Sequence, residues 1–256
     1  MSIHQTAIID SGAEFGKNVS VGPYTIIEND VVIADDAQIA SHVLIASGTR
    51  IGSGTKVHHG AVLGTLPQDL KFKDEKTTLE IGKNTTIREF ATLNRGTSDH
   101  WKTIVGDNCL LMAYSHVAHD CTIGNNVIIA NSVNMAGHVT IEDFVGIGGL
   151  CPIHQFVRIG THSFIGGGYR VPKDIPPYIL AMGEPIRYGG LNSVGLTRRG
   201  FSADILEMIK KAYRIIYRSN LLLKDALDKI EKEMNHSHDV MYLVNFFRNS
   251  ERGVIR

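Results

Sequence analysis

A six-residue period runs without interruption from Val105 to Val171 and limits the folds open to this chain. Its apolar positions are Val105, Leu111, Val117, Ile123, Ile129, Met135, Ile141, Ile147, Ile153, Ile159, Ile165 and Val171. An α-helix repeats about every 3.6 residues and a strand about every 2, so the period belongs to neither. It is typical of a parallel β-helix, in which stacked coils bury one continuous core.

The same period opens the chain and is interrupted twice. Its first run covers Ile3, Ile9, Phe15, Val21, Ile27, Ile33, Ile39, Ile45, Ile51, Val57 and Leu63. The sequence therefore predicts an all-β solenoid over residues 1–190, with loop insertions at about 65–79 and 94–103. Loops on a rigid scaffold often hold ligands, so we expect these two insertions to serve function.

Residues 191–256 are predicted to form a small C-terminal α-helical domain. From about Phe201 apolar residues recur at helical spacing, and Ser202 is placed to cap the first of three helices. Residues 172–256 hold 14 Lys and Arg against 10 Asp and Glu, so this part is net basic by four. The basic side chains expected to meet an acidic partner are Arg198, Arg199, Lys210, Lys211, Arg214 and Arg218.

Composition narrows the class of protein. The 26 basic and 26 acidic residues balance, which excludes a general attraction to nucleic acid or to membrane surfaces. Cys109, Cys121 and Cys151 all fall at the small inward position of the repeat, which indicates buried thiols in a reducing compartment. Neither a signal peptide nor a run of about 18 apolar residues occurs. We expect a cytoplasmic protein without a transmembrane segment.

Several histidines are predicted to gather on one edge of the solenoid. If three hexapeptides complete a coil, residues 18 apart lie above one another, as His119, Gly137 and Gln155 do. His138 and His154 are sequence neighbours of two of these residues, and His116 shares a turn with His119. Adjacent coils lie about 4.8 Å apart. The sequence therefore predicts an active site here.

Neutral imidazole is a suitable general base near pH 7, and the N–H of Gly137 is suited to hold an oxyanion. Because the cysteines point inward and no serine is suitably placed, these groups favour direct acyl transfer to a hydroxyl or an amine. One alternative is a zinc site held by three histidines, as in a hydratase of the γ-carbonic-anhydrase type. A second alternative is a solenoid scaffold without catalysis.

Longer motifs carry a resemblance to a known family. They are PQDLK (67–71), HVAHDCTIGNN (116–126), NMAGHVTIEDF (134–144), HQF (154–156), DIPPY (174–178) and LNSVGLTRRGFS (191–202). In these the chain resembles the UDP-N-acetylglucosamine O-acyltransferases, which catalyse the first step of lipid A synthesis in Gram-negative bacteria. The resemblance implies a left-handed β-helix and a homotrimer. It also implies transfer of a 3-hydroxyacyl chain from acyl carrier protein to the sugar 3-position of UDP-N-acetylglucosamine or its 3-amino analogue, without metal or other cofactor.

The resemblance also implies residue roles. His119 takes the place of the general base, Asp120 of the carboxylate that orients it, and Gly137 of the oxyanion donor. Substrate contacts are implied for Gln68, Asp69, Lys71, His116, His138, His154, Gln155, Asn192, Arg198 and Arg199. Acyl-chain length is expected to depend on Gly167, Tyr169 and Arg170. Two positions depart from the family pattern, because Asn94 replaces a frequent histidine and Val194 an expected acidic residue.

Overall fold

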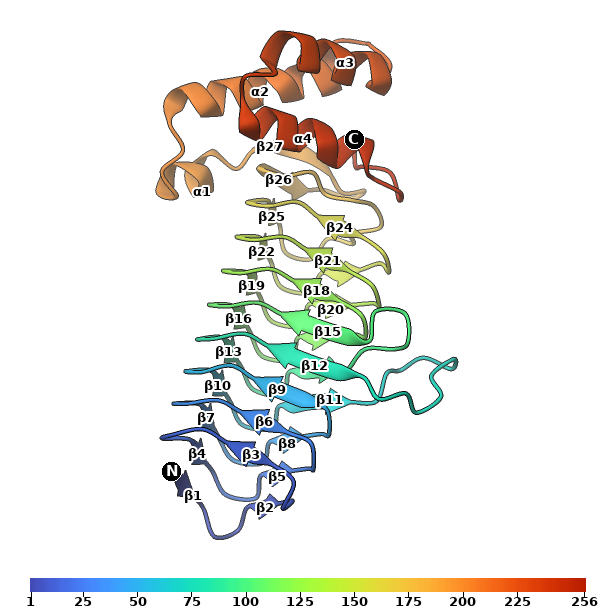
Figure 1. Ribbon diagram of the computed structural model, residues 1–256. Helices are drawn as coiled ribbons and strands as arrows, with labels where there is room; N and C mark the ends of the chain where they lie inside the picture. The colour runs from blue at the N-terminus through green and yellow to red at the C-terminus, as the bar shows by residue number, and fades with distance from the viewer.

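The computed structural model describes residues 1–256 and shows a three-sided prism with helices across one end (Figure 1). The N-terminus lies at the opposite end of the prism. Each coil contributes one short strand to each of three parallel sheets, which we call A, B and C. In most of these strands one residue is buried and its neighbour is not, as in Val32–Ile33. The predicted left-handed parallel β-helix of hexapeptide repeats is confirmed.

The three sheets run the length of the prism. Sheet A contains β1 (Ser2–Ile3), β4 (Ser20–Val21), β7 (Gln38–Ile39), β10 (Lys56–Val57), β13 (Thr86–Ile87), β16 (Leu110–Leu111), β19 (Ile128–Ile129), β22 (Gly146–Ile147), β25 (Phe164–Ile165), β26 (Ile179–Met182) and β27 (Arg187–Leu191). Sheet B contains β2 (Ile8–Ile9), β5 (Ile26–Ile27), β8 (Leu44–Ile45), β11 (Val62–Thr65), β14 (Thr92–Asn94), β17 (His116–Val117), β20 (Asn134–Met135) and β23 (Pro152–Ile153). Sheet C contains β3 (Glu14–Phe15), β6 (Val32–Ile33), β9 (Thr49–Ile51), β12 (Thr78–Ile81), β15 (Lys102–Val105), β18 (Thr122–Ile123), β21 (Thr140–Ile141) and β24 (Arg158–Ile159).

Residues 18 apart pair within each sheet, as Ser20 pairs with Gln38 and Thr122 with Thr140. The two insertions lengthen single coils, and they lie between β11 and β12 (66–77) and between β14 and β15 (95–101). Both project from the edge at which sheet B turns into sheet C, on the right in Figure 1. We call this edge the histidine edge, and its central turns are 118–121, 136–139 and 154–157.

The other two edges have contents of their own. The turns from sheet A to sheet B stack Tyr24, His42, His59, Phe90 and Tyr114, and we call them the aromatic edge. The turns from sheet C to sheet A carry Phe144 and His162, and we call them the α1 edge.

The core is one cluster of 57 buried residues that continues from the solenoid into the helices. Cys109, Cys121 and Cys151 are buried in it as free thiols, as predicted. The Cys121 Sγ donates to the carbonyl of Ala136 at 3.3 Å, which gives the buried thiol a partner.

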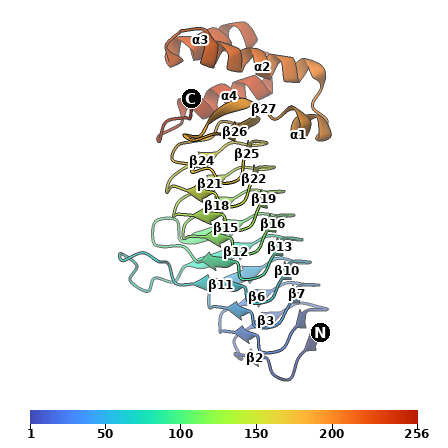
Figure 2. The same ribbon diagram turned by 180° about the vertical axis from the view of Figure 1, so that it is seen from behind.

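The C-terminal part contains α1 (Ser193–Arg198), α2 (Ala203–Arg218), α3 (Leu223–Met234) and α4 (His238–Arg248). The last three are the predicted helices, and the Ser202 hydroxyl caps α2 by accepting from the N–H of Ile205. The hairpin of β26 and β27 and the short helix α1 were not predicted. Figure 2 shows α2, α3 and α4 across the end of the prism, with α1 at one side. None of the helices is both long and apolar enough to cross a membrane.

Candidate active site

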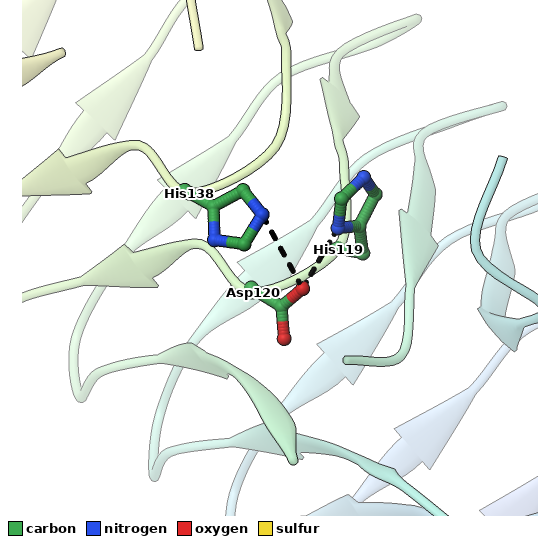
Figure 3. Close-up of side chains that lie close together, drawn as sticks. All are labelled: His119, Asp120 and His138. Carbon is green, nitrogen blue, oxygen red and sulfur yellow. Dashed lines mark hydrogen bonds and ion pairs between the residues drawn. The ribbon is translucent and has the colours of Figure 1, made fainter. Parts of the chain in front are cut away.

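His119 and Asp120 form a hydrogen-bonded pair on the histidine edge (Figure 3). The Nδ1 of His119 lies 2.8 Å from the Oδ2 of Asp120. A carboxylate can only accept, so Nδ1 carries the proton and donates it. Nε2 is then the basic nitrogen of the ring, and His119 is set up as a proton acceptor.

The second loop fixes Asp120 in place. Thr97 donates its N–H to Oδ1 of Asp120 at 2.8 Å and its hydroxyl to Oδ2 at 2.7 Å. Asp120 is 1% exposed, and its own N–H donates to the hydroxyl of Thr103. Burial acts to raise the pKa of Asp120, but hydrogen bonds from His119 and Thr97 outweigh it and hold that pKa below its usual value. Asp120 is therefore an ionised carboxylate that orients the imidazole.

Gly137 lies directly against the His119 ring. A Cβ at position 137 would stand 2.6 Å from Cε1 and 2.7 Å from Nε2 of His119, so only glycine fits without moving the ring. The N–H of Gly137 donates to no protein group. A donor that is free and close to the base is what an oxyanion site requires.

His138 lies in the next turn and faces the same carboxylate. Its Nε2 is 3.8 Å from Asp120 Oδ2, and its ring stacks on Phe156 with 4.5 Å between centroids. Burial, together with the neighbouring His119 and His100, lowers the pKa of His138, although Asp120 opposes the shift. His138 is thus a neutral imidazole at pH 7, able to donate or accept one hydrogen bond.

His116, His154 and Gln155 complete the edge. The Nδ1 of His116 is 2.7 Å from the Thr92 hydroxyl, and burial lowers the pKa of this imidazole. His154 and Gln155 are exposed in the turn one coil beyond His138. The structure therefore places His119, His138 and His154 in successive turns, whereas His116 lies in strand β17 just before the first of these turns and not in the turn itself.

The first loop carries the other polar residues predicted nearby. Asp69 Oδ1 accepts from the N–H of Lys71 at 2.9 Å, which shapes the tip of the loop. Gln68 and Lys71 are exposed, and Leu70 is fully exposed. No hydrogen bond joins these side chains to His119 within the chain.

Asn192, Arg198 and Arg199 lie on the α1 edge, across sheet C from His119. The side chain of Asn192 caps α1 and donates to the carbonyl of His162 at 3.0 Å. The guanidinium of Arg199 lies 4.3 Å above the ring of Phe144, and Arg198 is exposed. A single chain therefore does not bring these residues to the histidine edge.

The residues predicted to set chain length lie on the remaining edge. Gly167 follows β25 in the last turn of the aromatic edge, where a Cβ would meet the carbonyl oxygen of Gly149 at 3.2 Å. The ring of Tyr169 packs over Gly166 and is partly buried. Arg170 is exposed, 3.9 Å from Glu184.

Residue-by-residue reasoning missed the contribution of the second loop. Thr97 holds Asp120, and the His100 ring meets the His138 ring at 5.4 Å, with Asp99 3.8 Å from His138. The available signal was the break in the repeat, which marked the loop without indicating which side chains turn inward.

The ligand atoms of His119, Asp120 and His138 lie within 4.8 Å of one another, a spacing compatible with a metal ion. Asp120 Oδ2, however, already accepts from both His119 and Thr97. A metal ion there would displace hydrogen bonds that a general base needs. The geometry thus favours a general base at His119 over a metal site.

Two family models match the chain. Residues 102–137 match the family model described as "bacterial transferase hexapeptide (six repeats)". Residues 174–255 match the model for domain 2 of UDP-N-acetylglucosamine O-acyltransferase. The acyl-[acyl-carrier-protein]–UDP-N-acetylglucosamine O-acyltransferase of Trichlorobacter lovleyi is 52% identical over 100% of both chains. The enzyme of the same name from Paraburkholderia phymatum is 48% identical over 99% of both.

Solved structures of acyltransferases with this name resemble the chain as well. The UDP-N-acetylglucosamine acyltransferase of Francisella novicida superposes with a TM-score of 0.97 at 34% identity, covering 99% of this chain and 94% of that one. These relatives favour acyl transfer over the hydratase and scaffold alternatives. The chain belongs to the family of the acyl-[acyl-carrier-protein]–UDP-N-acetylglucosamine O-acyltransferases.

Proposed function

We propose that this chain transfers a 3-hydroxyacyl group from acyl carrier protein to the 3-position of the sugar of UDP-N-acetylglucosamine, or of its 3-amino analogue, as the first step of lipid A synthesis. The observation that carries the proposal is the His119–Asp120 pair against the free N–H of Gly137, in a chain of this family. No cofactor is proposed, because carrier protein and UDP-sugar are both substrates.

In the proposed mechanism His119 Nε2 removes the proton from the acceptor hydroxyl or amine as the acceptor atom attacks the thioester carbon. The carbonyl oxygen becomes an oxyanion and accepts a hydrogen bond from the Gly137 N–H. The tetrahedral intermediate then expels the thiolate of the carrier, and His119 returns the proton to that sulfur. The acyl group ends on the sugar and the carrier leaves as a free thiol.

Asp120 supports this cycle through its charge. It keeps the Nδ1 proton on the far side of the ring and stabilises the imidazolium that forms during transfer. Thr97 keeps the carboxylate in that position. His116, His138, His154 and Gln155 are proposed to hold the sugar and pyrophosphate, while Gln68, Asp69 and Lys71 read the acyl donor.

A homotrimer is proposed because the faces of the prism differ in charge. The outward positions of sheet C include the charged residues Glu14, Arg50, Glu80, Lys102 and Arg158. In the strands of sheets A and B up to β25, by contrast, the only charged residue is Lys56. Sheets A and B instead expose Ile8, Ile26, Ile128 and Phe164, with 42–66% of each residue accessible. Apolar faces depleted in charge are typical of the core of an interface.

Packing sheet A of one subunit on sheet B of the next would place the aromatic edge at a three-fold axis. It would also bring the α1 edge of one subunit toward the histidine edge of its neighbour. Asn192, Arg198 and Arg199 would then reach the nucleotide bound beside His119, where a guanidinium fork suits phosphate. Sedimentation at assay concentration tests this arrangement, and a fully active monomer would refute it.

We propose the cytoplasm as the place of action, since three free, buried thiols suit a reducing compartment. The activity is tested by mass spectrometry of the product formed from 3-hydroxyacyl carrier protein with each UDP-sugar. The expected product is an ester from the hydroxyl sugar or an amide from the amino sugar. Absence of both products would reject the proposal.

A further inference from the structure

The side chain at the end of β14 ties the first loop to the solenoid. Asn94 is the last residue of that strand and is 3% exposed. Its Nδ2 donates to the hydroxyl of Thr65 at 3.0 Å and to the carbonyl of Leu66 at 3.1 Å. A carbonyl oxygen only accepts, so the amide must turn its nitrogen toward Leu66. Both protons of that nitrogen are thus used where the first loop leaves β11.

The tip of the first loop makes no other hydrogen bond to the solenoid. Within residues 66–72 the remaining hydrogen bonds are local, because the N–H groups of Lys71 and Phe72 both reach Asp69. The first lies 2.9 Å from the carboxylate and the second 3.1 Å from the carbonyl. These bonds shape the tip without tying it to a sheet. The hydrogen bond from Asn94 to Leu66 is therefore the one that fixes how the tip projects.

The backbone of β11 prepares this attachment. β11 carries an extra residue, Gly64, before Thr65 pairs with Asn94. Gly64 has a φ of 76°, and a Cβ there would collide with the hydroxyl of Thr49, so only glycine fits. An extra residue bends the strand that carries it. The chain leaves sheet B directly after this bend, and the amide of Asn94 meets it there.

Arg95 supplies a second attachment from the next position. Its N–H donates to the carbonyl of Thr65 at 3.1 Å, and its guanidinium lies 5.6 Å from the centroid of the Phe72 ring. Two residues further on, Thr97 holds Asp120. One short segment after β14 therefore positions both the first loop and the carboxylate behind the base.

The oxygen of the same amide indicates that Asn94 is not there for stability alone. Its Oδ1 is buried and has no hydrogen-bond partner. A buried acceptor without a partner lowers stability, so an apolar side chain of the same shape should fold about as well. What an apolar side chain lacks is the pair of hydrogen bonds that Nδ2 donates to the start of the first loop.

Resting on the proposed function, we propose that Asn94 is a positioning residue for recognition of the 3-hydroxyl group of the acyl donor. The first loop carries Gln68 and Asp69, which are proposed to read that donor, and Asn94 fixes where they stand. A site that hydrogen-bonds a substrate hydroxyl rejects the analogue lacking it only while its polar groups are held in place. Loosening the loop should therefore cost selectivity and leave the chemistry at His119 intact.

The test compares a 3-hydroxyacyl carrier thioester with the thioester of the same chain length that lacks the hydroxyl. In wild type kcat/KM should be higher with the hydroxylated donor. Asn94→Leu keeps the branched shape and removes the N–H donors. It should lower kcat/KM for the hydroxylated donor by about tenfold and change that of the other donor by less than about twofold. The pH profile of kcat, which reports the base, should match that of wild type.

A matched control separates positioning from folding. Thr25→Val, on the aromatic edge, removes a buried hydrogen bond of 2.7 Å to the carbonyl of Ala40. It should lower the unfolding temperature and leave the ratio of the two kcat/KM values unchanged. Asn94→Leu should do the opposite, with an unfolding temperature close to that of wild type and a lower ratio. Phe72→Leu, which removes the ring beneath Arg95, should also lower the ratio.

Several results would overturn the role of Asn94. They are equal losses with both donors in Asn94→Leu, an unchanged ratio in that variant, or a displaced pH profile of kcat. A lower ratio in Phe72→Leu alone would assign the positioning to Arg95 instead. A wild-type ratio of one would show that the first loop does not read the hydroxyl. No transfer by wild type from either donor would reject the proposed function itself.

Discussion

Replacing Gly137 by alanine should disable the base without unfolding the chain. The added Cβ would stand 2.6 Å from Cε1 and 2.7 Å from Nε2 of His119, and ordinary carbon contacts begin near 3.4 Å. Because the obstructing atoms belong to a side chain, the imidazole must shift by about 1 Å, and a misplacement of that size costs about 10²-fold in rate. We therefore expect kcat to fall by about 10²-fold.

The matched control is Gly12→Ala, in an N-terminal turn on the same edge of the prism, where the nearest atoms to a new Cβ lie at 3.4 Å. Its kcat should equal that of wild type. Thermal unfolding of Gly137→Ala should show a loss of stability of at most about 1–3 kcal/mol, which is the usual cost of overpacking. A Gly137→Ala enzyme within about threefold of wild-type kcat would show that the glycine does not position His119.

Three further perturbations test Asp120, His162 and the residues proposed to set acyl-chain length. Asp120→Asn should lower kcat by about 10²–10⁴-fold with little change in KM, because the uncharged amide neither stabilises the imidazolium nor fixes its tautomer; an unchanged steady-state kcat would remove Asp120 from the mechanism. Burial, with help from the charge of Arg199, lowers the pKa of His162 from 6.5 to about 4. The stability contributed by the neutral His162 imidazole is therefore present above pH 6.5 and is lost as pH falls toward 4, because the unfolded chain binds a proton that the folded chain does not. In urea unfolding at pH 7 and pH 5, His162→Gln should therefore show a smaller difference in stability than wild type, and an equal difference would contradict this assignment. Finally, Gly167→Met should shorten and Arg170→Gly should lengthen the acyl chain found in the product by mass spectrometry; the same chain length in both would place the length determinant elsewhere.

Periodicity predicted the solenoid because its physical cause is local. Each hexapeptide places one apolar residue inward, so Val105 to Val171 could be assigned without knowledge of long-range contacts. The same rule predicted that His119, Gly137 and Gln155 would stack. The short helix α1 and the hairpin of β26 and β27 lacked such a signal, since Arg187–Leu191 is glycine-rich and α1 has only six residues.

Contacts made by loops could not be predicted in this way. The hydrogen bonds from Thr97 to Asp120 depend on a seven-residue excursion between β14 and β15 whose conformation follows no period. The family resemblance grouped Asn192, Arg198 and Arg199 with His119, yet one chain places them on different edges of the prism. That separation is a property of three-dimensional packing, and it is the reason why the trimer is part of the proposed site.

His119→Ala removes the side chain that is proposed to act as the base of the acyl transfer. The His119 side chain is only 12% exposed, but it lies outside the hydrophobic core cluster, so the variant should sediment like wild type. Acylated UDP-sugar formed from 3-hydroxyacyl carrier protein should be measured by mass spectrometry for both proteins at equal concentration. We expect turnover to fall by at least about 10²-fold in the variant. Turnover close to wild type in a correctly assembled His119→Ala protein would contradict the role of His119 as the base.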